Sequence, residues 1–211
     1  MKKVFVFIIL SIFSTFIFAQ NVIHNPGIKW RQQQVRINLS LIPQVEFVKI
    51  AGVMDFNISL SGVMTFNNKF FIGGYASKMP MRTYKDYAGI NYAVSYQQLG
   101  IHAGQNVNLG LYRTKGGHYV RRKTKFIYSL KLGGAAIWLV NKNKEQASSR
   151  DYSYMAQANL GVTRPLGKFI NLEVGGLYVA ALTIDQLGAY FDYNDFSGPG
   201  AYIALKFNLF R

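Results

Sequence analysis

The sequence predicts an all-β fold, an antiparallel up-and-down transmembrane β-barrel of about eight to ten strands. Residues 169–182 show the pattern most clearly, because apolar side chains occupy every second position while Asn171 and Glu173 lie between them. Residues 201–210 repeat this alternation, with Lys206 on the polar face. A period of two indicates β-strands, and an apolar face opposite a polar face is typical of a wall between lipid and a polar lumen.

The N-terminus has the pattern of a secretory signal peptide. Two lysines precede an apolar run at residues 4–18, and a small residue suited to cleavage follows it. No later segment has the roughly 18 consecutive apolar residues of a membrane-spanning helix. Residues 1–19 are therefore expected to be the signal peptide, residues 20–34 a polar N-terminal arm, and residues 35–211 the outer-membrane β-barrel.

The composition fits an exported membrane protein and limits the classes of partner that it can bind. The chain has no Cys, 16 Phe and 14 Tyr, and its formal net charge is +15. In a cytosolic protein such charge would favour nucleic acid, but export excludes that partner. The anions that remain are outer-membrane lipid, including lipopolysaccharide with its phosphates, surface polysaccharide, and an acidic protein partner in the envelope.

The first predicted strands are joined by one clear turn. Residues 35–47 alternate through Pro43, which predicts a bulge or a break because proline has no donor for the ladder. Residues 54–66 alternate most regularly. Asn67 and Asn68 then form a tight turn, because Asn tolerates positive φ, and residues 70–79 return along the sheet. Residues 80–86 are expected to form a polar loop.

Two more strands are predicted between residues 88 and 112, with a short turn near Leu99 and Gly100. The apolar residues expected to face outward in the first of them are Ile90, Tyr92, Val94 and Tyr96. Residues 126–140 keep one phase throughout, and residues 152–163 alternate before a tight turn at 164–167.

The short turns set the strand count and the orientation. Turns at the periplasmic end are short, and an even number of strands separates any two of them. Three candidate segments lie between the turns at 99–100 and 164–167. Either residues 126–140 split at Gly133 and Gly134, or one segment does not span, which leaves about ten or eight strands. The same parity predicts that the loops at 113–125 and 141–150 lie at the cell surface.

One of these loops is strongly basic. Six cationic residues occur within thirteen positions that contain no acid: Arg113, Lys115, Arg121, Arg122, Lys123 and Lys125. We predict that they contact an anionic glycolipid or an acidic partner, because Arg and Lys donate charge-assisted hydrogen bonds to phosphate and carboxylate.

Charged residues are also predicted on the lumen face of the strands. They are Arg36, Asp55, Lys131, Glu173 and Lys206. The interior of a small barrel is filled by side chains, and an unpaired buried charge is very costly, so these residues are expected to pair. Two interpretations stay open: an ion-pair network that plugs the lumen, and a narrow cation-lined path for anions.

The sequence predicts no catalytic residues, cofactor or metal site. Of the three histidines, His102 is expected to face inward, and none lies in a short motif with Ser and an acid. Cys is absent, and no His or Asp pair has metal-ligand spacing. An outer-membrane lipid-modifying enzyme, with Ser and His on the barrel rim, remains the alternative that would involve chemistry.

Three stretches resemble the small outer-membrane β-barrel proteins of the Bacteroidetes type. They are residues 53–75 with N-N-K and F-F-I-G-G-Y, residues 160–182, and the closing A-Y-I-A-L-K-F-N-L-F-R. Asn25-Pro26 is similar to the start of the PorP/SprF-like membrane proteins of type IX secretion and gliding. The resemblance implies a porin-like outer-membrane barrel of structural or binding type, or alternatively a membrane component of a secretion or gliding assembly.

Overall fold

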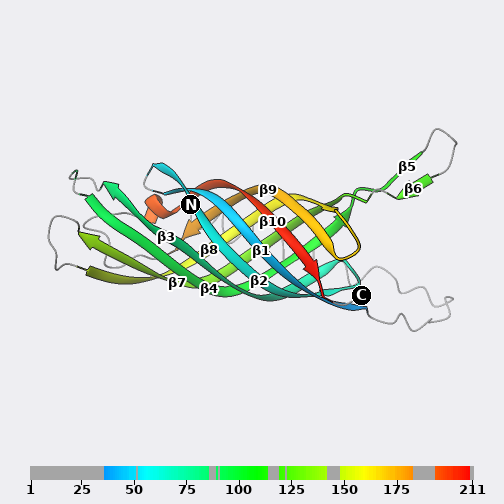
Figure 1. Cartoon of the computed structure of the whole chain (residues 1–211), viewed down its shortest axis with the longest axis horizontal. Helices are drawn as coiled ribbons and strands as arrows, with labels where there is room; N and C mark the ends of the chain where they lie inside the picture. Colours follow the sequence, from blue (N-terminus) through cyan, green and yellow to red (C-terminus); the bar gives the residue numbers. More distant parts are fainter. Residues whose placement is uncertain are drawn as a thin grey trace. The chain divides into compact units, whose positions relative to one another are not determined.

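Eight strands form a closed antiparallel barrel in the order β1-β10-β9-β8-β7-β4-β3-β2 (Figure 1). The computed structural model describes residues 36–50, 52–85, 89, 91–113, 119–121, 123–141, 148–182 and 193–209. The predicted signal peptide and N-terminal arm lie outside these residues. In the described part of the chain, no helix combines the length and the apolarity needed to span a membrane.

The barrel strands are β1 (Ile37–Ile50), β2 (Val53–Phe66), β3 (Phe70–Lys85), β4 (Asn91–Asn108), β7 (Lys125–Asn141), β8 (Ser148–Pro165), β9 (Ile170–Ala181) and β10 (Gly198–Asn208). A short hairpin pairs β5 (Leu111–Arg113) with β6 (Tyr119–Arg121), and a 3-10 helix, η2, covers Tyr193–Phe196. The strand β1 pairs with both β2 and β10, which closes the barrel.

An even number of strands places the first and last residues of the barrel at the same end. We call this end A; it carries Arg36, the turns at 67–69 and 166–169, the connection 109–124 with β5 and β6, and Asn208. The opposite end, end B, carries the connections 51–52, 86–90, 142–147 and 182–197. The two loops that the sequence placed together at the cell surface therefore lie at opposite ends, and that prediction is wrong.

Neither the bulge nor the break expected at Pro43 occurs. Pro43 lies inside the continuous strand β1 and pairs in register with Leu60 of β2. On the other side, the ladder with β10 has partners at Leu41 and Gln44 but none between them, with the register unchanged. The strand therefore accommodates the missing N–H donor of Pro43 through a local gap in the β1–β10 ladder.

The predicted loop at 80–86 is mostly strand. β3 continues to Lys85, and its register with β4 shifts between Met79 and Arg82. A bulge of this kind inserts one extra residue into one strand, here β3, so Pro80 needs no partner there. By contrast, the turn at Asn67 and Asn68 is confirmed, with φ of 51° and 57°.

The predicted turn at Leu99 and Gly100 is wrong, because both residues lie in the middle of β4. Tyr92, Val94 and Tyr96 are also buried inside the barrel rather than exposed outside it. β4 keeps one phase, but its apolar side faces the lumen near end B and the lipid near end A. The two predicted strands are therefore a single strand, and the barrel has eight strands rather than ten.

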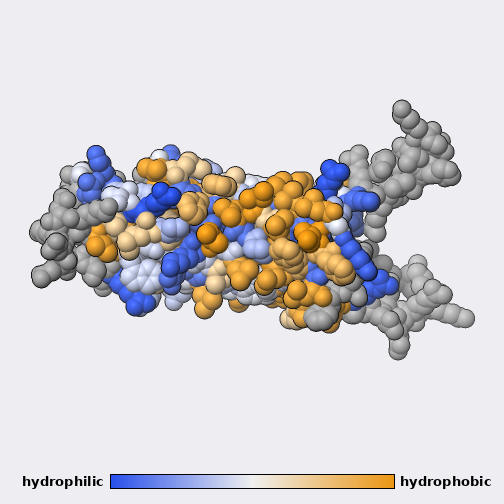
Figure 2. Space-filling model, viewed as in Figure 1, coloured by the Kyte–Doolittle hydropathy of each residue, from blue (hydrophilic) through white to orange (hydrophobic). Residues whose placement is uncertain are grey.

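The outer wall carries an apolar band bounded by aromatic residues. Tyr128 and Trp138 lie ten positions apart on the outward face of β7, and only Leu, Gly and Ala face outward between them. Ten steps of about 3.3 Å, tilted by about 40°, span about 25 Å, which is the height expected of such a band. Figure 2 shows apolar residues gathered around the middle of the barrel, with hydrophilic residues at both ends.

The predicted outward residues of β9 and β10 are confirmed. Val174, Ile203 and Leu205 are exposed on the wall, while Glu173 and Lys206 are buried inside. In a water-soluble protein such exposed apolar residues would need a covering partner, whereas here lipid covers them.

Replacing Leu205 with Arg tests the lipid-facing wall. We expect Leu205→Arg to lower the free energy of unfolding by about 2–4 kcal/mol, because a cation near the midplane leaves water for hydrocarbon. Urea titration of the protein folded in lipid vesicles, read by heat-modifiable migration, measures this change. Leu166→Arg, in the exposed turn at end A, is the control and should cost less than about 1 kcal/mol. Equal costs for the two variants would contradict the assigned band.

Candidate functional site

The described part of the lumen has three levels along the barrel. Apolar side chains fill it near end B, a hydrogen-bonded polar cluster crosses its middle, and a basic pocket opens at end A. The five predicted lumen charges are divided among these levels and do not form one network.

The lumen near end B is closed by apolar side chains. Met79, Val94 and Ile137 are fully buried there, at 0 % exposure. Phe196 of η2 is also buried in the same cluster. Close-packed apolar groups therefore fill most of the described lumen at this level, and Asp55 and Asp151 are the buried charged residues near it.

The middle of the lumen is crossed by one buried ion pair. Lys131 of β7 is 0 % exposed, and its Nζ lies 2.6 Å from Glu46 Oε1 of β1. The strands β1 and β7 are four places apart in either direction around the barrel, so this pair joins opposite walls. Lys131 Nζ also donates to Ser59 Oγ at 2.9 Å and to Gln44 Oε1 at 3.3 Å.

Glu46 accepts from neutral donors as well as from Lys131. Asn57 Nδ2 donates to it at 2.8 Å, Gln157 Nε2 at 3.0 Å and Ser59 Oγ at 3.1 Å. Lys131 was predicted to face inward and to need a partner, and both statements are confirmed. Glu46 was not identified as the partner, although it lies in phase with Ser40 on the lumen face of β1.

His102 belongs to this middle level. Its Nδ1 lies 3.0 Å from Ser61 Oγ and its Nε2 lies 3.1 Å from Ser129 Oγ, and its ring meets that of Phe71 edge-on. The predicted inward orientation is confirmed, with 3 % exposure. Both ring nitrogens therefore contact hydroxyl groups inside the packed lumen, away from either rim.

Asp55 lies apart from the other predicted lumen charges, at the end of β2 near end B. The Tyr84 hydroxyl donates to one of its carboxylate oxygens, and Arg82 Nε lies 3.6 Å from the other. The Arg82 guanidinium also lies over the Phe56 ring, 5.3 Å from its centroid. Asp55 is thus paired locally and joins neither the Lys131–Glu46 pair nor the basic pocket.

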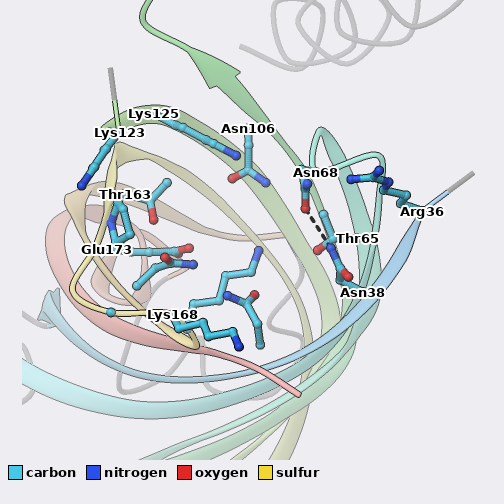
Figure 3. Close-up of a pocket in the computed structure, with 15 residues that line it drawn as sticks. Arg36, Asn38, Thr65, Asn68, Asn106, Lys123, Lys125, Thr163, Lys168 and Glu173 are labelled. Atoms are coloured by element: carbon cyan, nitrogen blue, oxygen red, sulfur yellow. Dashed lines mark hydrogen bonds between the residues drawn. The ribbon is translucent and has the colours of Figure 1, made fainter. Parts of the chain in front are cut away.

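The basic pocket at end A, here called the vestibule, has a volume of about 350 Å³ (Figure 3). Its lining contains five cationic residues and one acid: Arg36, Lys123, Lys125, Lys168, Lys206 and Glu173. The remaining lining residues are mostly Asn and Thr. Figure 3 shows Lys123 and Lys125 on one side of the pocket and Arg36 on the other. The vestibule thus joins three predicted lumen residues with two residues of the predicted basic loop.

The floor of the vestibule holds a buried acid and a buried cation. Glu173 is 4 % exposed and Lys206 is 5 % exposed, on the adjacent strands β9 and β10. Lys206 Nζ lies 5.1 Å from the centroid of the Phe71 ring. The Glu173 Oε1 atom is buried without a hydrogen-bond partner, which is costly unless a water or a ligand donor meets it.

The rim of the vestibule is held by amide side chains. Asn38 Nδ2 donates to Asn68 Oδ1 at 2.8 Å, which ties β1 to the turn at 67–69 (Figure 3). Ser40 Oγ donates to Asn208 Oδ1 at 3.0 Å, which ties β1 to β10. These contacts fix the opening around the cationic side chains.

The rest of the predicted anion-contact set lies outside the vestibule lining. Arg113 lies in β5 and Arg121 in β6, and only their backbone is described. Lys115 and Arg122 lie outside the described residues. No group of three or more His, Asp or Glu side chains suited to a metal occurs among the residues that the structure describes.

Breaking the buried pair tests its role in the barrel. We expect Lys131→Met to lower the free energy of unfolding by about 3–5 kcal/mol, because Glu46 would remain as an uncompensated buried charge. Adding Glu46→Gln should restore part of the loss, so the double variant is more stable than additivity predicts. Urea titration in lipid vesicles measures the cycle. Arg82→Gln, which removes a half-exposed pair, is the control and should cost about 1 kcal/mol or less. Additive single effects would contradict a direct interaction.

No protein-family model and no curated protein matches the sequence. Among solved structures, the chain is similar to Neisserial surface protein A, with a TM-score of 0.56 and 8% identity over 82% of this chain and 97% of that one. Weaker similarities are to Ail of Yersinia pestis, solved with sucrose octasulfate (TM-score 0.46, 12% identity, 83% and 99% covered). The N-terminal β-barrel domain of Pseudomonas aeruginosa OprF gives a TM-score of 0.47 at 11% identity, with 83% and 100% covered. The shared fold and the apolar outer band make this chain a small outer-membrane β-barrel.

Proposed function

We propose that this barrel is a binding protein without catalytic activity, and that its vestibule takes an anionic ligand or an acidic partner of the envelope. The observation that carries the proposal is the vestibule itself, where five cationic residues and one acid surround a pocket of about 350 Å³. Several cations that converge on one site bind an anion far better than isolated surface pairs do. Asn side chains on the rim add neutral donors and acceptors for a polar ligand.

A plugged lumen fits the observations better than an anion path. An ion that leaves the vestibule would have to separate Lys131 from Glu46 and then cross the apolar level near end B. Both steps carry a high cost, because they expose buried charge and break close packing. The vestibule is therefore a dead-end pocket, which suits binding rather than conduction.

We propose that end A faces the periplasm and end B the cell exterior. The chain reaches the outer membrane from the periplasmic side, and end A carries both ends of the barrel. The connection 109–124 at end A also holds five of the six clustered cations. Moving so many charges across hydrocarbon is expensive, so their retention in the periplasm is favoured. The basic hairpin would then meet periplasmic anions rather than the cell surface.

Two alternatives lead to different chemistry. A membrane component of a secretion or gliding assembly, as the Bacteroidetes-type and PorP/SprF-like resemblances imply, would use the vestibule for an acidic protein partner. Copurification of a stable complex in mild detergent would favour that function. A lipid-modifying enzyme is the less favoured alternative, because His102 is buried between Ser61 and Ser129 inside the lumen.

Neutralising two vestibule cations tests the proposed anion site. We expect Lys123→Gln/Lys168→Gln to weaken binding of tripolyphosphate by about 5–10-fold at low salt, since each exposed pair contributes a few tenths to 1 kcal/mol. Isothermal titration calorimetry of the purified barrel in neutral detergent measures the affinity. The matched control is Lys49→Gln/Lys85→Gln, which removes the same charge from exposed sites near end B. Equal weakening in both variants, or in neither, would contradict a specific site.

Single cysteines test the orientation, because the natural chain contains none. We expect Lys49→Cys at end B to react with a membrane-impermeant maleimide on intact cells. Lys168→Cys at end A should react only after the outer membrane is permeabilised, because that turn would face the periplasm. The reverse pattern of labelling would invert the proposed orientation.

A further inference from the structure

A groove lies on the outer wall of the barrel, separate from the lumen. Its volume is about 920 Å³, and β2, β3, β4, β7 and β8 all contribute to it. It begins at the level of Trp138, at the end-B edge of the apolar band, and runs into the band. The groove is therefore placed where a lipid headgroup meets its acyl chains.

The strand register explains why the wall is hollow here. Ala76, Leu99, Gly134 and Tyr154 follow one another across four strands at one level. The next level toward end B contains Lys78, Gln97, Ala136 and Tyr152. Gly134 and Ala136 of β7 form the floor, between Leu99 of β4 on one side and Tyr152 and Tyr154 of β8 on the other. These large flanking residues are 72%, 63% and 67% exposed, respectively, and Ala76 of β3 lies on the far side of Leu99.

The floor of the groove is open toward lipid. A Cβ atom added at Gly134 would meet no protein atom within 4 Å. A hollow of this size within the hydrocarbon is filled by lipid, because the atoms that line an empty hollow would lose their dispersion contacts. Its apolar floor and sides suit an acyl chain.

The end-B edge of the groove is cationic. Lys78 and Arg150 are both exposed there, and the Arg150 guanidinium lies 5.2 Å from the Trp138 ring centroid and 4.9 Å from that of Tyr152. These ring contacts hold a cation at the level of the aromatic boundary.

No acid competes for these cations on the described part of the wall. The acids of the described strands are all buried inside the barrel: Glu46, Asp55, Asp151 and Glu173. The remaining described acid, Asp195, lies in η2. The edge of the groove is thus complementary to an anionic headgroup.

We propose that this groove binds one phosphorylated glycolipid of the lipid A class. An acyl chain lies over Gly134 and Ala136, and a phosphate accepts hydrogen bonds from Lys78 and Arg150. Arg and Lys both bind phosphate oxygens through charge-assisted hydrogen bonds, and Tyr152 offers a donor to the sugar. The choice of a glycolipid over a phospholipid rests on the proposed orientation, which puts end B in the outer leaflet.

Native mass spectrometry of the detergent-solubilised barrel tests the site. The measured quantity is the fraction that retains one molecule of diphosphorylated lipid A at equal molar amounts. We expect Lys78→Gln/Arg150→Gln to weaken the apparent affinity at least about tenfold, given roughly a factor of several per cation near an anionic surface. Lys49→Gln/Lys85→Gln removes the same charge elsewhere and should stay within about twofold of the natural chain.

A second variant tests the groove without changing any charge. Gly134→Leu fills the floor on the outer wall, where an added Cβ meets no protein atom within 4 Å, so the barrel should fold normally and show unchanged heat-modifiable migration. It should weaken lipid A binding about as much as the charge variant does, because the acyl chain loses its place.

Several outcomes would contradict the proposal that the groove binds lipid A. They are no retention by the natural chain, equal loss in the matched control, full retention by Gly134→Leu, and retention of phosphatidylglycerol as strong as that of lipid A. The measurement is made in micelles and uses residues outside the vestibule. Failure here therefore leaves the vestibule proposal untouched, and failure of tripolyphosphate binding leaves the groove untouched.

Discussion

The barrel depends on filling a narrow lumen while giving the cation at its centre a buried partner. Eight strands enclose room for side chains only, so the inward-facing residues must satisfy one another. The Lys131–Glu46 pair meets this constraint across the full width of the lumen, from β7 to β1. Neutral partners from β1, β2 and β8 complete its hydrogen bonds. The pair thereby couples walls that share no ladder, and it separates the apolar level near end B from the vestibule at end A.

The strands that the sequence predicted well are those whose outward face is apolar from end to end. β2 has polar residues inside along most of its length, and β9 and β10 have charged residues inside near end A, at Glu173 and Lys206. With an apolar outward face, the period of two therefore identifies both the strand and its facing. β4 differs because the lumen that it lines is apolar near end B and polar toward end A. Tyr92 and Tyr96 fill the apolar level, whereas Leu99 and Ile101 face lipid. The apolar residues therefore move from even to odd positions within one strand, and this change of phase has the same appearance in the sequence as a turn.

Individual residues of the candidate site could be predicted from the sequence, but which of them lie together could not. A charge on the lumen face needs a partner, and this requirement identified Lys131, Glu173 and Lys206 from the sequence. Which residues meet depends on closure of β10 onto β1 and on the register around the barrel. Arg36, Lys125 and Lys206 come from distant parts of the chain and share one pocket. No local sequence pattern indicates that these residues are close in space. Because β4 has no turn at Leu99, the basic connection 109–124 lies at end A and not at the end that the sequence predicted.

The charges of the described strands are sorted between the inside and the outside of the barrel. Glu46, Asp55, Asp151 and Glu173 are all buried inside, whereas Lys78 and Arg150 are exposed outside. A carboxylate on the wall would have no partner in hydrocarbon, while a long cationic side chain reaches the interface and keeps its apolar stem in the band. Two of the buried acids, Glu46 and Asp55, form ion pairs within the barrel, while Lys78 and Arg150 face the surroundings. The vestibule and the wall groove both agree with this distribution, since cations outnumber acids in the lining of each, one opening from the lumen at end A and the other facing lipid near end B.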